Sequence, residues 1–465
     1  MTEVVSELRR GLHFRTLVST STGLAFAAIQ YLAVASLLTV VAGKYAWLAV
    51  LVAGVLVLLA WAFFSELCGI FPTAAAIRRY MQASMRDEAA LTITFTYMSS
   101  IVLVMAADAY IVGSAIASAL NEPGWVVSGY IALMLGIATF ANLKGVTVAG
   151  AVQDVATYII LGVTAVIAVI ACFHTTSPVA HALELTRPVG VGGFVQAVAL
   201  GILLFSAFEW VTTSAEEVLD VRQIPKAMLI SVGILAAICA ALTYGMAKLL
   251  NADEIGSAFP QLALGRHALG AFGYWTMAGI TALTALDTFN GGFITASRFI
   301  YAAAREGALP HKAARLNNNA VPWVPVIALA IASLLVSVAV SLTHSWQVIL
   351  SVGAALESMI FAVAGLCVLR LRKRLPDVER PFRMRAPRTF TIAGIVIFGF
   401  LSLTAGLSVD NKFDARPLVI LLVVGGICAG YVLGYIPKLQ AAEAARAAAA
   451  PQRRRPVANT DSKES

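Results

Sequence analysis

The sequence predicts an all-α polytopic membrane protein with about twelve transmembrane helices. Hydrophobic residues make up 59% of its 465 residues, charged residues make up 12%, and the mean hydropathy is +0.84. These values lie outside the range of soluble globular domains. Apolar stretches long enough to cross a hydrocarbon core of roughly 30 Å recur along the chain, and such stretches fold as helices because lipid offers the backbone no hydrogen-bond partners.

Twelve apolar segments have the length of a membrane span. They lie near residues 17–42, 46–70, 90–119, 125–141, 150–173, 194–213, 227–250, 269–302, 323–343, 346–369, 390–408 and 416–436. With both termini on one side, the basic residues left on the other side are few: Lys44, Arg187, Lys248, Arg266, Lys412 and Arg416. The positive-inside rule therefore predicts cytoplasmic termini. The net charge of +8 then reflects topology and anionic lipid rather than nucleic-acid binding.

The sixth segment is interrupted by polar residues before the hydrocarbon core has been crossed. Its apolar run ends in Phe205-Ser206-Ala207-Phe208-Glu209-Trp210, and hydroxyl residues follow. An ionisable group at this depth is costly unless it faces the protein interior or a water-filled cavity. Glu209 is therefore a candidate functional residue, with an interhelical hydrogen bond as the alternative role.

The first segment contains a comparable interruption, Ser19-Thr20-Ser21-Thr22-Gly23. An opened helix presents N–H groups from one half and carbonyl groups from the other, and transporters built from inverted repeats place two such breaks five spans apart, around the substrate. We therefore expect N–H groups at Ser21, Thr22 and Gly23 to receive a carboxylate. Carbonyl groups near Ser19 and near residues 205–207 would accept an amine, so an α-amino acid fits both. A Ser/Thr-rich packing face is the alternative.

The residues that follow the sixth break carry a family resemblance. Ala215-Glu216-Glu217-Val218, Arg222 and Ile224-Pro225-Lys226 resemble the sixth-span signature of the amino acid-polyamine-organocation (APC) permeases. Similar stretches are Ser65-Glu66-Leu67 with Pro72, and Asn290 followed by Ser297-Arg298-Phe299 and Gly307-Ala308-Leu309-Pro310. Three features depart from the family. Ala207 replaces the usual glycine, the hydroxyl string of span one replaces a glycine-rich one, and Ala75-Ala76-Ile77-Arg78-Arg79-Tyr80 replaces the usual Gly-Gly-x-Tyr after span two.

The resemblance covers roughly residues 10–440 and implies a LeuT-type fold with inverted repeats of five spans each. The expected organisation is a cytoplasmic N-terminal segment (1–16), a transporter core (17–370), spans eleven and twelve with a basic loop (371–440), and a disordered cytoplasmic tail (441–465). It implies a multi-pass protein of the plasma (inner) membrane that moves amino acids by alternating access, as a symporter or antiporter. An amine, polyamine or ethanolamine permease and a non-transporting sensor of the same fold are the alternatives.

Four more acidic residues lie at membrane depth, namely Asp108, Asp154, Asp287 and Glu357. Asp287 lies between Thr284 and Thr288 on span eight, which in the family packs against the break in span one. These three residues are the candidate site for a coupling ion, H+ or Na+, with a structural hydrogen bond as the alternative. Proton-coupled relatives carry a lysine in span five, and the matching position is Ile160, which leaves an acid, Na+ or exchange open. Tyr110 on span three is a candidate wall of the substrate pocket.

No pattern typical of an enzyme is visible. The six histidines stand singly, the five cysteines have no paired spacing, and Gly190-Val191-Gly192-Gly193 follows no predicted strand. We therefore expect no catalytic residues, no metal site and no cofactor. The expected partners are a small amino acid or amine substrate and membrane lipid, without nucleic acid, and the sequence does not specify an oligomeric state.

Overall fold

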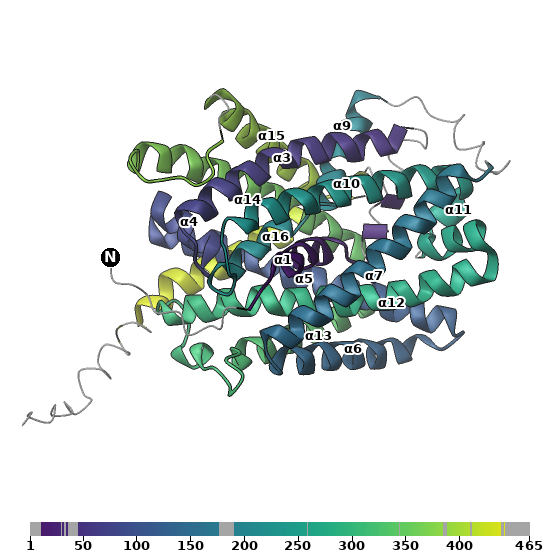
Figure 1. Ribbon diagram of the computed structural model, residues 1–465, viewed down its shortest axis with the longest axis horizontal. Helices are drawn as coiled ribbons and strands as arrows, with labels where there is room; N and C mark the ends of the chain where they lie inside the picture. Colours follow the sequence, from purple (N-terminus) through teal and green to yellow (C-terminus); the bar gives the residue numbers. More distant parts are fainter. Residues whose placement is uncertain are drawn as a thin grey trace, which may run out of the picture.

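The computed structural model describes residues 11–28, 30–31, 34–35, 45–175, 190–257, 259–343, 345–384, 388–409, 412–438 and 441. Within them, eleven helices are long and apolar enough to cross a membrane. The elements (Figure 1) are α1 Phe14–Ala25, α3 Ala46–Ile70, α4 Ala76–Ser84, α5 Asp87–Ala119, η2 Gly124–Val126, α6 Val127–Leu143, α7 Val146–Phe173, α9 Val191–Leu203, η3 Phe208–Glu216, α10 Gln223–Leu249, α11 Ala252–Ile255, α12 Pro260–Arg305, η4 His311–Ala314, α13 Trp323–Thr343, α14 Trp346–Arg374, α15 Arg388–Gly406, β1 Ser408–Val409, β2 Lys412–Phe413 and α16 Arg416–Gly434.

These eleven helices coincide with predicted segments two to twelve, which confirms the all-α polytopic fold class. The first predicted segment, 17–42, contains α1, but most of its second half lies outside the described residues, as do residues 1–10 and 442–465. The two short strands pair Ser408 with Phe413 between α15 and α16. They form a small antiparallel hairpin and do not alter the helical architecture.

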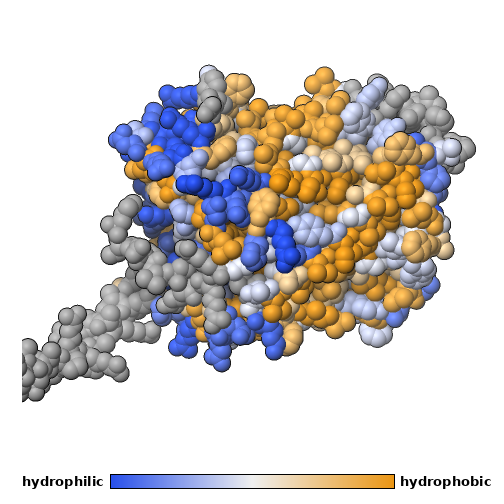
Figure 2. Space-filling view, in the orientation of Figure 1, coloured by the Kyte–Doolittle hydropathy of each residue, from blue (hydrophilic) through white to orange (hydrophobic). Residues whose placement is uncertain are grey.

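The outer surface of the bundle is apolar, as expected of helices that face lipid. Figure 2 shows a broad hydrophobic band across the middle of the molecule, with hydrophilic side chains gathered toward its ends. Large apolar side chains with high exposure include Phe272 (73%), Leu335 (65%) and Phe140 (64%). Helices that are apolar on every side are typical of membrane spans.

Contacts between helices repeat when the first five spans are exchanged for the next five. Helix α1 packs on α10, and correspondingly α9 packs on α3. Helix α7 packs on α10 and α12, and its counterpart α14 packs on α3 and α5. In the same way α6 packs on α12, and its counterpart α13 packs on α5. This exchange symmetry is the one expected of two five-span inverted repeats.

Helix α12 begins earlier than the sequence predicted. It starts at Pro260, and the predicted start at residue 269 falls on a sharp kink at Leu269 (φ −138°) and Gly270 (φ +65°). The two arms of the kink approach so closely that a Cβ atom at Gly265 would strike the backbone of Gly273. Glycine permits both features, since it tolerates positive φ and close backbone approach.

Acid–base pairs fasten one end of the bundle. Arg298 of α12 binds Glu217 just after η3, with a distance of 2.9 Å from Nε to Oε2 and side chains that are each 1% exposed. Arg305 binds Glu216 at 3.0 Å, and the N–H group of Gly11 donates to the carbonyl of Glu217 at 2.9 Å. We call this region the ion-paired end; it ties span six to span eight and to the segment before α1.

The buried pair predicts a measurable effect on stability. We expect Arg298→Leu to lower the free energy of unfolding by about 3–5 kcal/mol, because it leaves the Glu217 carboxylate buried without a partner. A double variant, Arg298→Leu with Glu217→Leu, should recover much of this loss. Thermal unfolding of the detergent-purified protein measures both, and identical midpoints for wild type and the single variant would contradict the expectation.

Candidate functional site

Span six is broken where the sequence predicted an interruption. Helix α9 ends at Leu203, and the N–H groups of residues 204–206 then bond three residues back rather than four. Ala207 follows in the left-handed conformation (φ 69°, ψ 3°), and η3 continues as a 3-10 helix. The alanine therefore occupies the conformation for which glycine is the usual residue.

Span one is broken later than predicted. Helix α1 runs through Ser19–Gly23 to Ala25, and the chain leaves helical geometry at Phe26 (φ −104°, ψ 64°). The N–H groups of Ser21, Thr22 and Gly23 therefore lie inside a continuous helix and are not the open carboxylate donors that we expected. Hydroxyl groups do not require an opened helix, because they can bond to the carbonyl of the preceding turn, as Thr22 does to Val18 at 2.6 Å.

The hydroxyl string of span one joins neighbouring spans. Ser19 donates to Asp154 of α7, Ser21 donates to the carbonyl of Phe208 at 2.9 Å, and the Thr22 hydroxyl lies 2.9 Å from the Ser231 hydroxyl of α10. Thr20 is also buried, with 2% exposure. The packing role that we weighed as the alternative is thus the role that these contacts describe.

Gln30 connects the two breaks. Its Nε2 donates to the carbonyl of Ala25 at 2.7 Å and to the carbonyl of Leu203 at 3.2 Å, at the ends of α1 and α9. The side chain is 3% exposed, and its Oε1 has no hydrogen-bond partner among the described residues. One amide group therefore satisfies a carbonyl at each interrupted helix.

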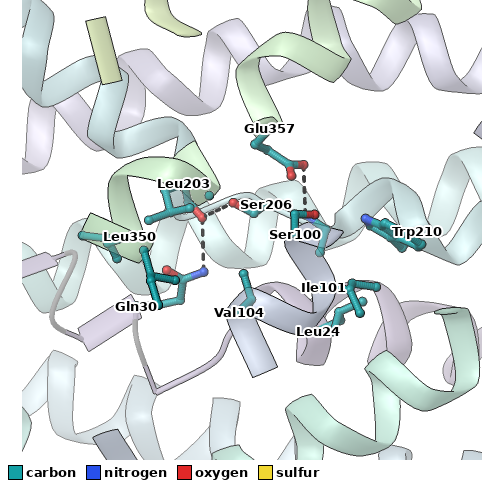
Figure 3. A pocket seen from close by; sticks show the side chains of 13 residues that line it. Leu24, Gln30, Ser100, Ile101, Val104, Leu203, Ser206, Trp210, Leu350 and Glu357 are labelled. Atoms are coloured by element: carbon teal, nitrogen blue, oxygen red, sulfur yellow. Dashed lines mark hydrogen bonds between the residues drawn. The ribbon is translucent and has the colours of Figure 1, made fainter. Parts of the chain in front are cut away.

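A small cavity lies between the breaks (Figure 3). Its volume of about 20 Å³ leaves room for little more than one water molecule. It is lined by Leu24, Gln30, Ser100, Ile101, Val104, Leu203, Ser206, Ala207, Trp210, Ile349, Leu350, Gly353 and Glu357, which come from spans one, three, six and ten. A larger ligand therefore requires the walls to separate.

Only part of the predicted substrate set lines this cavity. Ser206 and Ala207 do, whereas Phe205 packs its ring beside Gly54 and Tyr110 is not a lining residue. The sequence reasoning did not select the polar lining residues Gln30, Ser100, Trp210 and Glu357. The sequence did indicate Glu357, because it is an acidic residue at membrane depth. It indicated Gln30 more weakly, as an amide side chain within an apolar segment.

Glu209 lies beside the cavity in a buried polar cluster. The Tyr97 hydroxyl donates to Glu209 Oε1, and Trp210 Nε1 donates to the Tyr97 oxygen at 2.8 Å. Glu357 Oε1 accepts from the N–H group of Ala207 at 3.1 Å, and its Oε2 lies 3.2 Å from the Tyr97 oxygen. Glu357 is thus the carboxyl group that both lines the cavity and contacts the break in span six.

Asp287 lies against span one, as expected, but its bonding partners come from α7. Gln153 Nε2 donates to Asp287 at 2.7 Å, and the Thr157 hydroxyl lies 2.8 and 2.9 Å from its two oxygens. A Cβ atom at Gly23 would strike Asp287, Thr157 and Gln153. The missing side chain at Gly23 therefore makes room for this carboxyl group.

The two threonines grouped with Asp287 in the prediction are oriented differently. The Thr284 hydroxyl donates to the carbonyl of Thr281 in its own helix at 2.6 Å, and the Thr288 hydroxyl has no partner among the described residues. A run of neighbouring polar residues on one helix therefore does not form the bonded set. The bonded set spans two helices, which a sequence pattern does not reveal.

The strained alanine at the sixth-span break yields a test. An L-residue in the left-handed region costs roughly 1–2 kcal/mol, so Ala207→Gly should unfold at a temperature equal to or above that of wild type. Ala207→Val should unfold at a lower temperature because a β-branched side chain is an outlier at positive φ. Ala199→Gly in the regular part of α9 is the control and should lose about 1 kcal/mol. Equal midpoints for the valine variant and wild type would contradict the strain.

Comparison with known proteins places this architecture in a family. The Asc-type amino acid transporter 1 of Mus musculus is 25% identical over 218 residues, which cover 46% of this chain and 40% of that protein. The large neutral amino acids transporter small subunit 2 of Rattus norvegicus is 24% identical over 286 residues, covering 58% and 51%. The chain thus aligns with about half, or less, of the length of these relatives. The amino acid permease family model matches residues 12–429, and the chain belongs to this family of the APC superfamily.

Proposed function

We propose that the protein is a secondary active transporter that moves amino acids across the plasma (inner) membrane by alternating access. The supporting observation is that the breaks after Ala25 and at Ala207, five spans apart, meet at one small cavity. The printed names of the relatives, which are amino acid transporters, favour the same substrate class. Most basic residues lie on the side of the ion-paired end and the two termini, so by the positive-inside rule this side faces the cytoplasm.

The geometry suggests how an α-amino acid binds. After the first break, Gln30 N bonds to Ala27 O and Tyr31 N bonds to Ala28 O, so the N–H groups of Ala27 and Ala28 precede the first bonded turn and are the donors that we propose for a carboxylate. They replace the donors that we expected at residues 21–23. The Oε1 atom of Gln30 is a buried acceptor available to the ammonium group.

The remaining cavity wall favours a neutral side chain. Ile101, Val104, Leu203 and Leu350 are apolar, and no basic residue lines the cavity among the residues that the structure describes. Burying a charged side chain against such a wall is costly without a paired charge. The class that fits is therefore a neutral, mainly apolar amino acid.

One observation supports the alternative of an amine carrier. Glu357 is a carboxyl group in the cavity lining, and it could pair with a cationic amine that lacks a carboxylate. The sensor alternative predicts binding without turnover. Competition of amino acids and decarboxylated amines against labelled substrate distinguishes an amino acid carrier from an amine carrier. Counterflow in proteoliposomes distinguishes a transporter from a sensor.

Filling the cavity tests the substrate site. We expect Val104→Trp to reduce counterflow of a labelled neutral amino acid by about tenfold or more, because overpacking a closed site costs about 1–3 kcal/mol. Val55→Trp is the matched control, since Val55 is 65% exposed on the lipid-facing surface of α3. If Val104→Trp shows counterflow at the wild-type rate, the substrate site lies elsewhere. If the wild-type protein shows no counterflow, the proposed function is contradicted.

We also propose that Asp287 binds the coupling ion, H+ or Na+, next to span one. It is 1% exposed, and it connects α12 with α7 directly beside Gly23 of α1. These are the helices whose relative position must change for the site to open. An ion at this carboxyl group would therefore favour one arrangement of the helices over another.

Asp287→Asn tests this coupling. The variant keeps the side-chain size and an oxygen that accepts from Gln153, but it removes the charge. We expect gradient-driven accumulation to be lost, while exchange of internal for external substrate remains measurable at a lower rate. Imposed H+ and Na+ gradients are compared in the same vesicles, and accumulation at the wild-type level would return Asp287 to a structural role.

A further inference from the structure

The cluster of Tyr97, Glu209, Trp210 and Glu357 separates the substrate cavity from the ion-paired end. Tyr97 lies one helical turn before Ile101, a cavity residue, in the direction of Asp87 at the start of α5. Beyond the cluster is an open recess of about 980 Å³, lined by Thr73, Asp87, Glu216 and Arg305 among others. The four side chains therefore lie between the cavity and the end of the bundle that carries the recess, and we call them the barrier.

The Tyr97 hydroxyl contacts two carboxyl groups but has only one proton to donate. A phenol oxygen offers one proton and two lone pairs. Trp210 occupies one lone pair, and we assign the single hydroxyl proton to Glu209 Oε1, the closer of the two carboxyl oxygens. The contact with Glu357 Oε2 at 3.2 Å is then a hydrogen bond only if Glu357 carries a proton and donates it to the second lone pair.

The charges around the cluster also indicate that one of the two carboxyl groups carries a proton. Glu209 and Glu357 are 0% and 3% exposed and interact with each other directly. Among the described residues, no lysine, arginine or histidine bonds to either carboxyl group. Two buried carboxylates in contact, without a cation, do not both stay ionised.

The charged and titratable groups on the surrounding helices have other partners. Arg298 of α12 is paired with Glu217, and Arg305 is paired with Glu216. On α4 and α3, Tyr80 interacts with Cys68 and Thr212. On α3 and α14, Glu66 binds Arg372 at 2.6 Å. None of these interactions supplies a counter-charge to the carboxyl pair.

We propose that Glu357 is a proton-binding site of the transport cycle, loaded while the barrier is closed and emptied toward the ion-paired end when it opens. Separation of η3 from α14 would break the bond from Ala207 N–H to Glu357 and the contact with Tyr97, and water from the recess would then accept the proton. One proton is taken up on the opposite side in each cycle and one is released, so the proton travels with the substrate. This inference rests on the proposed function.

The Glu357 site is distinct from Asp287. It lies among α5, η3 and α14, whereas Asp287 lies among α1, α7 and α12. Gln153 Nε2 and the Thr157 hydroxyl both donate to Asp287. The bonds at Asp287 therefore close without an added proton, while those at Glu357 do not.

The test measures proton movement and substrate movement in the same proteoliposomes. A pH-sensitive dye in the lumen reports protons, and labelled neutral amino acid reports substrate. In wild type we expect uptake to acidify the lumen and an imposed pH gradient to drive accumulation. In Glu357→Gln the amide retains a donor for Tyr97 and an acceptor for Ala207, so slower counterflow persists, but substrate-driven acidification falls by about tenfold or more.

Matched variants locate the proton. Glu357→Asp keeps a titratable group and should retain acidification, and Glu209→Gln should retain it as well, because the amide oxygen still accepts from the Tyr97 hydroxyl. Acidification that survives in Glu357→Gln, or disappears only in Glu209→Gln or Asp287→Asn, would overturn the assignment to Glu357.

The wild-type protein alone also tests the proposal, whatever the folding of the variants. Counterflow without any proton movement would overturn the proton site and leave the proposed transport function intact. No counterflow of any amino acid in wild type would overturn the transport function itself. The two failures are therefore distinguishable.

Discussion

The structure depends on satisfying the backbone groups at two helix breaks in an apolar environment. An unpaired carbonyl buried away from water costs free energy comparable to a lost hydrogen bond. Gln30 supplies donors to the carbonyls of Ala25 and Leu203, Ser21 supplies one to Phe208, and the Glu357 carboxyl group accepts from Ala207. The bonds that pair the interrupted backbone also hold spans one, six and ten around the cavity, so stability and the site share the same atoms.

The proposed transport cycle requires other bonds to open. At the predicted cytoplasmic side, α1 is fastened to α7 through Asp154, which accepts from Arg15 at 3.0 Å and from Thr16 at 3.1 Å. Span six is fastened to α12 through Glu217 and Arg298. Opening toward this side must break or move these contacts together, because each holds one of the two half-helices that cover the cavity. The barrier formed by Tyr97, Glu209, Trp210 and Glu357 lies between them and the substrate.

The sequence predicted the spans well because span length and hydropathy are local properties. The break in span six was also predictable from the sequence, since Ser206 and Glu209 interrupt an apolar run. The break in span one was misplaced because hydroxyl groups at Ser21 and Thr22 bond equally well from an intact helix. The bonded partners of Asp287 and the contact between Tyr97 and Glu357 join residues that are 130 or more positions apart, and only the packing of helices brings such residues together.

A structure determined with a bound amino acid tests the central claim most directly. The account predicts ligand density between Leu24 and Gln30 on one side and Ala207 and Trp210 on the other, with the carboxylate at the N–H groups that follow the first break. It further predicts a cavity wider than the present volume of about 20 Å³. Density at another location, with the cavity between the two breaks still closed, would contradict the account.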